Sequence, residues 1–493
     1  MSFSKITSAQ AHFLNISLID IEVDLSRGLN SFSIVGLTDK AIDESKERVS
    51  ASIKNSGFES PKSRNQRTTV SLAPANLRKE GPNFDLPIAL AYLLATGDIR
   101  FDPKDRLFLG ELSLDGSLRP IKKALSLVIG AKKFGIKEIY LPFQNIDEVS
   151  VISDIVIFGV NNLREVVGHL NEKEKDRKIL KPIQHKNFSG TKNYIEVDFS
   201  DIKGQELAKR ALEIAGAGRH NIMLYGPPGT GKTMLAKAFP HILPTLSFEG
   251  VLEVTSIHSY AGIYSGFVLS PPFRFPHHSS SHIAIIGGGA FPKPGEITLS
   301  HRGVLFMDEF PEFDSSVIES LRQPLEDKKI NISRVHGSLV FPADFILVAS
   351  MNPCPCGFLD SSHKDCVCTY KSIQKYQNKI SGPIADRIDM WVEVSEIDYK
   401  KMGENIKNES TFDIQKRVET VRKIQEERFL KHFPLSKMCR KLLDNYAEKL
   451  HLSPRVYNKL IKLARTIADL DKKKDIEELH LLEAFQYRPK IKD

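Results

Sequence analysis

Long apolar runs and evenly spread cysteines are both missing from this sequence. No stretch of about 18 uninterrupted apolar residues occurs, so the sequence predicts no membrane-spanning helix. Met1–Gln10 lacks a basic flank followed by an apolar segment, and we therefore expect no signal peptide. The five cysteines, four of them crowded into 15 positions, are unlike the disulfide framework of a secreted protein. These absences predict a cytoplasmic protein with no membrane partner.

A large excess of charge of one sign is also absent. Lys and Arg number 69 against 61 Asp and Glu, which leaves a formal net charge of +8. That balance permits contact with a polyanion, but a solvated surface of mixed charge explains it equally well, because the charge is spread along the chain. With 493 residues the chain is too long for a single core, and several domains are expected.

Four regions differ in pattern. Residues 1–170 alternate strand-like runs with turns and two helical stretches, and residues 171–194 form a polar, Lys-rich linker. Residues 195–395 alternate strands and helices around glycine-rich turns, which predicts an α/β fold with a parallel sheet covered on both faces. Residues 396–493 have apolar residues at helical spacing, which predicts a small helical bundle.

A strand-like run, Ile222–Tyr225, leads into a G-x-x-x-x-G-K-T loop and then into a helix-forming segment. This is the strand–loop–helix setting of a phosphate-binding loop, in which glycines let backbone N–H groups surround phosphate. Lys232 then supplies a charge to the β- and γ-phosphates, and Thr233 offers a hydroxyl to Mg²⁺. The loop residues that we expect to bind nucleotide are Gly226, Pro227, Pro228, Gly229, Thr230, Gly231, Lys232 and Thr233.

Two further apolar runs end in polar side chains. The run 303–307 stops at Asp308 and Glu309, which puts both acids at the carboxyl edge of a sheet, where phosphates bind. We expect Asp308 to hold Mg²⁺ and Glu309 to activate the attacking water as a general base. The run 345–351 ends at Asn352, whose amide would orient that water or contact the γ-phosphate; the alternative is an Asn that caps a turn.

Several motifs together carry a resemblance to a known family. They lie at residues 271–279, 287–296, 301–310, 352–357 and 381–389, and they include Pro-Pro-Phe-Arg-Phe-Pro-His-His-Ser and Asn-Pro-Cys-Pro-Cys-Gly. The sequence resembles the magnesium-chelatase-like AAA+ ATPase family, in its YifB/ComM branch, over essentially its whole length. The resemblance implies a P-loop parallel-sheet core, ATP and Mg²⁺ as ligands, and assembly into a ring, expected to be a hexamer.

The resemblance also implies roles for single residues. Arg387, at the end of Ser-Gly-Pro-Ile-Ala-Asp-Arg, matches the arginine that contacts the neighbouring subunit's γ-phosphate; a surface ion pair with Asp386 or Asp389 is the alternative. Arg455, at the start of a C-terminal helix, resembles a second nucleotide sensor, and an Arg on a helix surface is the alternative. The segment that borders adenine in such ATPases corresponds here to Ile202, Gly204 and Gln205.

Alternating apolar residues around a turn predict a β-hairpin over 329–340. In related ring helicases this hairpin points into the central pore, so the resemblance implies DNA as a partner, contacted through phosphate by Lys328 or Lys329, Arg334 and His336. A hairpin that merely faces solvent is the alternative.

The cysteines Cys354, Cys356, Cys366 and Cys368 form the pattern C-x-C-x9-C-x-C. Four thiolates in two close pairs predict a structural tetrahedral Zn²⁺ site that leaves no position for water. His363 could replace one thiol, and unliganded thiols or a redox disulfide are the alternatives.

The segments 78–85, 110–120 and 135–142 match, in that order, the proteolytic domain of Lon-type proteases. Residues 69–165 thus resemble this α+β domain, which uses a Ser–Lys dyad. Asn83 stands at the position of the serine and Leu125 at that of the lysine, although Lys122 and Lys123 are near. A carboxamide and an isobutyl group cannot act as nucleophile and base, so we expect no peptidase activity.

The hypothesis that follows is an ATP-driven, ring-shaped DNA motor of the helicase or branch-migration type, acting in recombination or natural transformation. Its alternative is a chelatase-like AAA+ ATPase that remodels a protein partner without moving DNA.

Overall fold

The computed structural model divides into two compact units. One comprises Met1–Gly190 with Thr255–Phe267, and the other Thr191–Val254 with Val268–Asp493. The structure describes residues 3–13, 15–37, 39–79, 81–174, 177–185, 196–263, 266–289, 292–334, 337–359, 361, 364–396, 408–428, 433 and 435–488. Among the helices of those residues, none is both long and apolar enough to cross a membrane.

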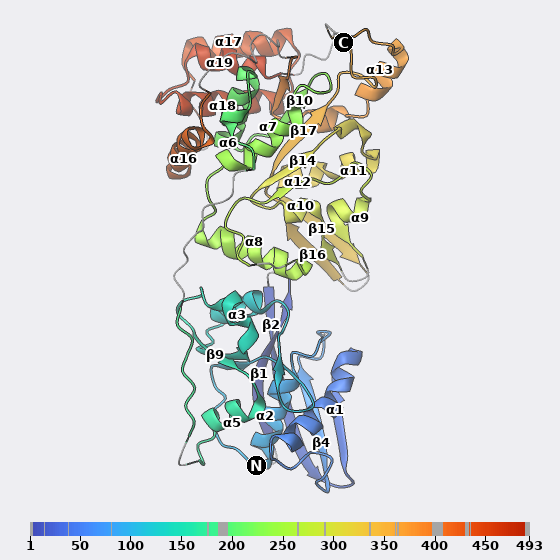
Figure 1. The fold of residues 1–493 in the computed structure, drawn as a ribbon, viewed down its shortest axis with the longest axis vertical. Helices are drawn as coiled ribbons and strands as arrows, with labels where there is room; N and C mark the ends of the chain where they lie inside the picture. Colours follow the sequence, from blue (N-terminus) through green and yellow to red (C-terminus); the bar gives the residue numbers. More distant parts are fainter. Residues whose placement is uncertain are drawn as a thin grey trace. The chain divides into compact units, whose positions relative to one another are not determined.

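The first unit contains a four-stranded sheet with the order β1-β2-β4-β3 (Figure 1). Neighbouring strands are antiparallel except for the parallel pair β3 and β4. A helix, α1, joins these two parallel strands and begins after Asp39, whose side chain accepts a hydrogen bond from the backbone N–H of Ile42. The bounds are β1 Phe3–His12, β2 Asn15–Arg27, β3 Ser31–Val35, α1 Lys40–Asn55 and β4 Gln66–Ala73.

A parallel sheet with the order β5-β8-β9 completes the first unit, together with the hairpin β6–β7. The helix α2 is almost entirely buried and packs against β1 and β2 in one apolar core. The bounds are α2 Asp85–Thr96, β5 Arg106–Phe108, β6 Glu111–Leu112, β7 Leu118–Arg119, α3 Ala124–Lys133, β8 Glu138–Pro142, α4 Ile146–Val149, β9 Val156–Val160 and α5 Leu163–Leu170.

The second unit is built on the predicted parallel sheet, with the order β11-β14-β17-β10-β18. All four neighbouring pairs are parallel, so the carboxyl ends of the strands meet at one edge. The strands β10, β14 and β17 are the three apolar runs identified in the sequence. Their bounds are β10 Ile222–Tyr225, β11 Phe273–Arg274, β14 Val304–Met307, β17 Ile346–Met351 and β18 Met390–Glu393.

The second unit also contains helices and two hairpins (Figure 1), and of α8 only residues 248–254 belong to it. The hairpin β15–β16 confirms the one predicted from the alternating apolar pattern. Before α13 the chain passes through the cysteine-rich segment. The bounds are α6 Glu206–Gly218, α7 Lys232–Ala238, α8 Phe248–Ala261, α9 His282–Ile286, β12 Gly287–Gly288, β13 Lys293–Pro294, α10 Glu296–Leu299, α11 Ser315–Ser320, α12 Arg322–Asp327, β15 Lys329–Arg334, β16 Gly337–Pro342, α13 Tyr370–Gln377 and α14 Gly382–Ala385.

The C-terminal region is helical, as the spacing of its apolar residues predicted. α16 and α18 pack against α6, and their buried residues belong to the same apolar core as the sheet strands β10 and β17. α18 begins at the predicted Ser-Pro-Arg segment, where the Ser453 side chain accepts a hydrogen bond from the N–H of Val456. The bounds are α16 Thr411–Glu427, α17 Lys437–Lys449, α18 Pro454–Leu470 and α19 Glu478–Gln486.

Candidate nucleotide site

The glycine-rich loop joins β10 to α7 at the carboxyl edge of the sheet. A Cβ atom on Gly226 would overlap the carbonyl oxygen of Val394 at the end of β18, so only glycine fits there. Gly231, directly before α7, has a φ of 91°, in the left-handed region that favours glycine. The sequence motif therefore has a steric basis in the packing of two neighbouring strands.

Lys232 lies under this loop and is 8% exposed. Its Nζ donates hydrogen bonds to the carbonyl oxygens of Gly226 and Pro227, each at 2.7 Å. Burial lowers the pKa of Lys232 to about 8, although the carboxylates of Asp308 and Glu309 act in the opposite direction. The ammonium group of Lys232 is thus largely removed from water, and it donates hydrogen bonds to neutral carbonyl groups. An anion such as phosphate would therefore be a better partner for it.

Asp308 is held through both of its carboxylate oxygens. The hydroxyl of Thr233 donates to Oδ2 at 2.9 Å, and the hydroxyl of Ser350 donates to Oδ1. Thr233 and Asp308, the two residues predicted to bind Mg²⁺, are thus in contact, and their oxygens are the donors that this ion prefers. Ser350 was not predicted to be at the site. The signal for it was a hydroxyl within the apolar run of β17, two positions before Asn352.

Asn352 directly follows β17 and reaches the loop. Its Oδ1 accepts a hydrogen bond from the Nζ of Lys232 at 3.2 Å. The hydroxyl of Tyr376 in α13 interacts with the backbone of Asn352, and burial raises the pKa of that tyrosine. The structure thus brings together polar residues from three strand ends.

Glu309 follows β14 with a φ of 51° and a side chain that is about half exposed. Its Oε2 lies 3.4 Å from the Nδ1 of His278, which comes from the segment after β11. This segment is one of the motifs that carry the family resemblance, but nothing in the sequence assigned a role to His278. The imidazole of His278 therefore contacts the carboxylate of Glu309, which we expect to act as the general base.

The segment predicted to border adenine is tied to the same loop. The Nε2 of Gln205 donates to the carbonyl oxygens of Thr230 at 3.2 Å and Ser395 at 2.6 Å. Ile202 is 4% exposed, and Gly204 has a φ of 64°. These contacts join the segment before α6 to the phosphate loop and to the residues after β18.

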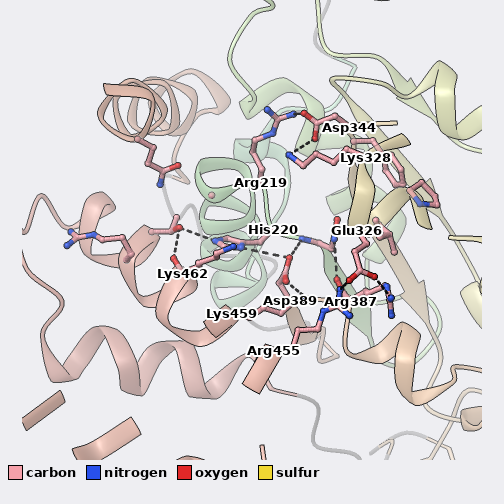
Figure 2. A pocket seen from close by; sticks show the side chains of 18 of the residues that line it. Arg219, His220, Glu326, Lys328, Asp344, Arg387, Asp389, Arg455, Lys459 and Lys462 are labelled. Carbon is pink, nitrogen blue, oxygen red and sulfur yellow. Dashed lines mark hydrogen bonds and ion pairs between the residues drawn. The ribbon is translucent and has the colours of Figure 1, made fainter. Parts of the chain in front are cut away.

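Arg387 and Arg455 lie at the opposite, amino edge of the sheet. They line a cavity of about 670 Å³ whose wall includes Asn221, the residue before β10. Figure 2 shows both guanidinium groups directed toward Glu326. The Nη2 of Arg455 lies 2.6 Å from Oε1 of Glu326, and the Nη2 of Arg387 contacts Oε2.

The partner of Arg387 is therefore Glu326, and neither Asp386 nor Asp389 has the role that the alternative interpretation gave it. Asp389 pairs instead with Lys459 at 2.6 Å. From Asn221 to Gly226 a parallel strand rises by about 3.3 Å per residue, or about 16 Å in total. Arg387 and Arg455 are thus separated from the phosphate loop of their own chain by the height of the sheet.

The comparisons with known proteins agree with this architecture. Residues 198–402 match the family described as magnesium chelatase, subunit ChlI, residues 21–145 match subunit ChlI of Mg-chelatase, and residues 408–488 match the C-terminal part of that subunit. The competence protein ComM of Haemophilus influenzae is 39% identical, over 100% of this chain and 98% of its own length. This chain belongs to the YifB/ComM branch of the magnesium-chelatase-like AAA+ family.

Of two other relatives, one matches nearly the whole chain and the other only a third of it. The uncharacterized protein YifB of Escherichia coli is 38% identical over 99% of this chain and 97% of its own length. The magnesium-chelatase 67 kDa subunit of Chlorobaculum parvum is 29% identical, but over only 32% of this chain and 23% of its own length. Membership of the AAA+ ATPases implies ATP and Mg²⁺ as ligands.

The four cysteines predicted to bind zinc form a cluster in this family member. Their sulfur atoms all lie within 4.8 Å of one another. The Sγ of Cys354 lies 3.4 Å from that of Cys356 and 3.6 Å from that of Cys366, and all four thiols are free of disulfides. A tetrahedron with Zn–S bonds of about 2.3 Å has edges of about 3.8 Å, so these spacings fit a four-thiolate site.

The thiols of the cluster differ in pKa, which is lowered at Cys356 and raised at Cys366 and Cys368. Backbone N–H groups, above all that of Phe358, lower the pKa of the Cys356 thiol to about 6. Zinc binds thiolates, and a divalent ion would relieve the repulsion that crowded thiolates impose on one another. Four close thiolates are a soft donor set typical of Zn²⁺. His363, the alternative ligand, lies outside the described residues.

The hairpin residues have different surroundings. Lys328 pairs with Asp344 at 3.0 Å, whereas Lys329, the first residue of β15, is exposed. His336 and the side chain of Arg334 lie outside the part of the chain that the structure describes, so their DNA contacts stay predictions.

In the first unit, Leu125 is fully buried in α3 and Asn83 is half-buried before α2. Lys123, the nearby amine, lies over the ring of Tyr260 with Nζ 4.2 Å from the ring centroid. Neither predicted dyad position carries a nucleophile or a base.

Proposed function

We propose that this chain is a ring-forming ATPase that uses ATP hydrolysis to move DNA. The observation that carries the proposal is the division of polar groups between the two edges of one parallel sheet. The loop, Asp308, Glu309 and Asn352 gather at the carboxyl edge, and an arginine pair gathers at the amino edge. A ring in which the amino edge of one protomer meets the carboxyl edge of the next would complete each site.

At the carboxyl edge, the backbone of the loop would bind the phosphates of ATP, and Lys232 would exchange its carbonyl acceptors for phosphate oxygens. Thr233 and Asp308 would hold Mg²⁺, which neutralises charge on the β- and γ-phosphates. Glu309 would take the proton of the attacking water. Asn352, beside Lys232, would position that water or the γ-phosphate, and Ile202, Gly204 and Gln205 would border adenine.

Arg387 and Arg455 would act on the ATP of the adjacent protomer. A guanidinium fork matches the charge that spreads over the transferred phosphoryl oxygens, and an arginine supplied in trans contributes about 10³- to 10⁵-fold to such hydrolysis. Glu326 would keep both arginines side by side until phosphate replaces it. A closed ring, which we take to be a hexamer, gives every protomer both halves of a site.

A mixing experiment tests the trans arrangement. Lys232→Ala removes the loop half of a site and Arg387→Ala removes the arginine half, so each variant alone is expected to be inactive. In a random mixture of the two, about one quarter of the interfaces combine two working halves, and ATP hydrolysis should return. Two inactive variants that stay inactive when mixed, although they co-assemble, would refute action in trans.

DNA as the track rests on the relative named a competence protein and on the hairpin β15–β16. We therefore propose a helicase or branch-migration motor that works in the cytoplasm, in recombination or natural transformation. Lys329, Arg334 and His336 would contact DNA phosphate in the ring's pore. The decisive measurement is the ATPase rate with and without single-stranded and forked DNA, with Lys232→Ala as the inactive control.

The second candidate is an ATPase that remodels a protein partner. The observation in its favour is the match to magnesium chelatase subunit ChlI over residues 198–402. An ATPase rate that DNA leaves unchanged, with no unwinding of forked DNA, would favour this candidate. For the first unit, with Asn83 and Leu125 at the dyad positions, we propose a role in assembly or DNA guidance and no peptidase activity.

A further inference from the structure

The cysteine cluster lies beside the nucleotide site. Asn352, at the end of β17, is separated from Cys354 by one residue. Cys354 is 1% exposed, so the first ligand of the cluster is buried where the strand ends. Asn352, which reaches Lys232, and Cys354, a predicted metal ligand, are thus two positions apart on the same stretch of backbone.

The same stretch packs on the phosphate loop. Gly357 has a φ of 86°, and a Cβ atom built there would lie 2.8 Å from Cδ of Pro228 and 3.9 Å from Cγ of Asn352. Because a Cβ hardly ever approaches another carbon that closely, the backbone at Gly357 is in direct contact with the loop. The cysteine loop therefore packs on the second proline of the phosphate loop, close to the amide that faces Lys232.

The far side of the cysteine loop is held by α13. The Nε2 of Gln377 donates to the carbonyl oxygen of Pro353 at 3.1 Å. Thr369, one residue after Cys368, caps this helix by accepting a hydrogen bond from the N–H of Ser372. Cys354 and Cys368 thus lie at the two ends of a segment that runs from β17 to α13. Asn352 directly follows β17, and Tyr376 of α13 interacts with its backbone.

We propose that a divalent zinc-type ion, bound by Cys354, Cys356, Cys366 and Cys368, fixes Asn352 and the Pro228 turn in the arrangement that hydrolyses ATP. The metal acts as a positioning element, because the loop that carries its ligands packs on the phosphate loop at Gly357, and the ion itself need not touch the substrate. Binding of Cys366 and Cys368 to the same ion as the buried Cys354 holds the loop against Pro228, and loss of the ion lets Asn352 move away from Lys232. The inference rests on the proposed ATPase function but not on DNA as the track.

The test uses the full chain, with the double variant Cys366→Ser/Cys368→Ser and the matched control Cys439→Ser. Cys439 is buried in α17, where its thiol donates to the carbonyl oxygen of Ile476, away from the cluster. Zinc per chain, the Kd of a fluorescent ATP analogue, the ATPase kcat without DNA and the thermal midpoint are measured for each protein. We expect one zinc per chain in the wild type and in the control.

The double variant should lose its zinc and at least tenfold in kcat, while its Kd for ATP changes by less than about threefold. A zinc-free double variant with wild-type kcat would overturn the proposal, as would wild-type protein that binds no zinc. A double variant that does not fold is replaced by Gly357→Ala, which keeps all four cysteines but pushes the loop away from Pro228.

Gly357→Ala should bind one zinc per chain and still lose at least tenfold in kcat; an unchanged kcat in this variant contradicts the coupling. Since every assay omits DNA, a failure of the DNA-motor proposal would appear separately, as an ATPase that DNA does not stimulate.

Discussion

The Nζ of Lys232 and the Oδ1 of Asn352 lie 3.2 Å apart, although 120 positions separate them in the sequence. The contact links the lysine of the phosphate loop to the residue after the neighbouring strand β17. A γ-phosphate bound by Lys232 would therefore lie within reach of the Asn352 amide.

Asn352→Ala tests that relationship. Removing one polar group that faces a reacting centre costs about 10²-fold in kcat, and ATP binding should change far less, because loop and Lys232 remain. Single-turnover hydrolysis and equilibrium binding separate the two quantities. Asn378→Ala, an exposed position at the end of α13, is the control. Equal losses in binding and in turnover would assign Asn352 a role in the ground state instead.

Glu309→Gln should retain ATP without cleaving it. The amide cannot accept the proton of water, and loss of a general base costs about 10²- to 10⁴-fold. Bound nucleotide recovered after gel filtration should be ATP for the variant and ADP for the wild type. Glu312→Gln, which alters an acid that pairs with Lys379 at 3.4 Å, should hydrolyse normally. A variant with more than a tenth of the wild-type rate would exclude Glu309 as the base.

Arg387→Lys should not preserve activity, even though it preserves the charge. Lysine lacks the planar fork of donors, and we expect kcat to fall by about 10³-fold. Arg219→Lys is a matched control, because Arg219 lines the same cavity and pairs with Asp344 at 2.7 Å. Steady-state ATPase assays at saturating ATP give the comparison. A fully active lysine variant would mean that only a point charge is required.

His220 should make the second unit sensitive to acid. Burial lowers the pKa of His220 from 6.5 to about 4, so the folded state keeps the imidazole neutral where the unfolded state binds a proton. Its contribution to stability is present above pH 6.5 and is lost as the pH falls toward 4, by about 3 kcal/mol. Denaturant unfolding at pH 7.5 and pH 4.5 measures this loss.

His220→Gln is the matched variant, since the amide can still reach Thr466, whose hydroxyl lies 3.0 Å from the Nε2 of His220. The stability lost between the two pH values should be smaller in the variant than in the wild type. The same pH dependence in both proteins would show that other groups cause the acid sensitivity.

Local sequence determined the parts of this protein that depend on neighbouring residues. A strand, a glycine loop and Lys232–Thr233 follow one another within a dozen positions, and backbone sterics allow few other structures for them. Asp308 and Asn352 could be placed at the same edge because parallel strands align their carboxyl ends. The hairpin β15–β16 and the C-terminal helices were likewise readable from apolar periodicity.

Only the tertiary structure decided which distant side chains meet. No spacing rule in the sequence encodes these contacts, because they arise from the packing of elements that are far apart in the chain. They are the contacts of Ser350 with Asp308, of His278 with Glu309, and of Glu326 with Arg387 and Arg455. The contact of Gly357 with Pro228 is of the same kind. Local periodicity specifies which face of an element is apolar, whereas the partner of a polar group depends on how those faces close around one core.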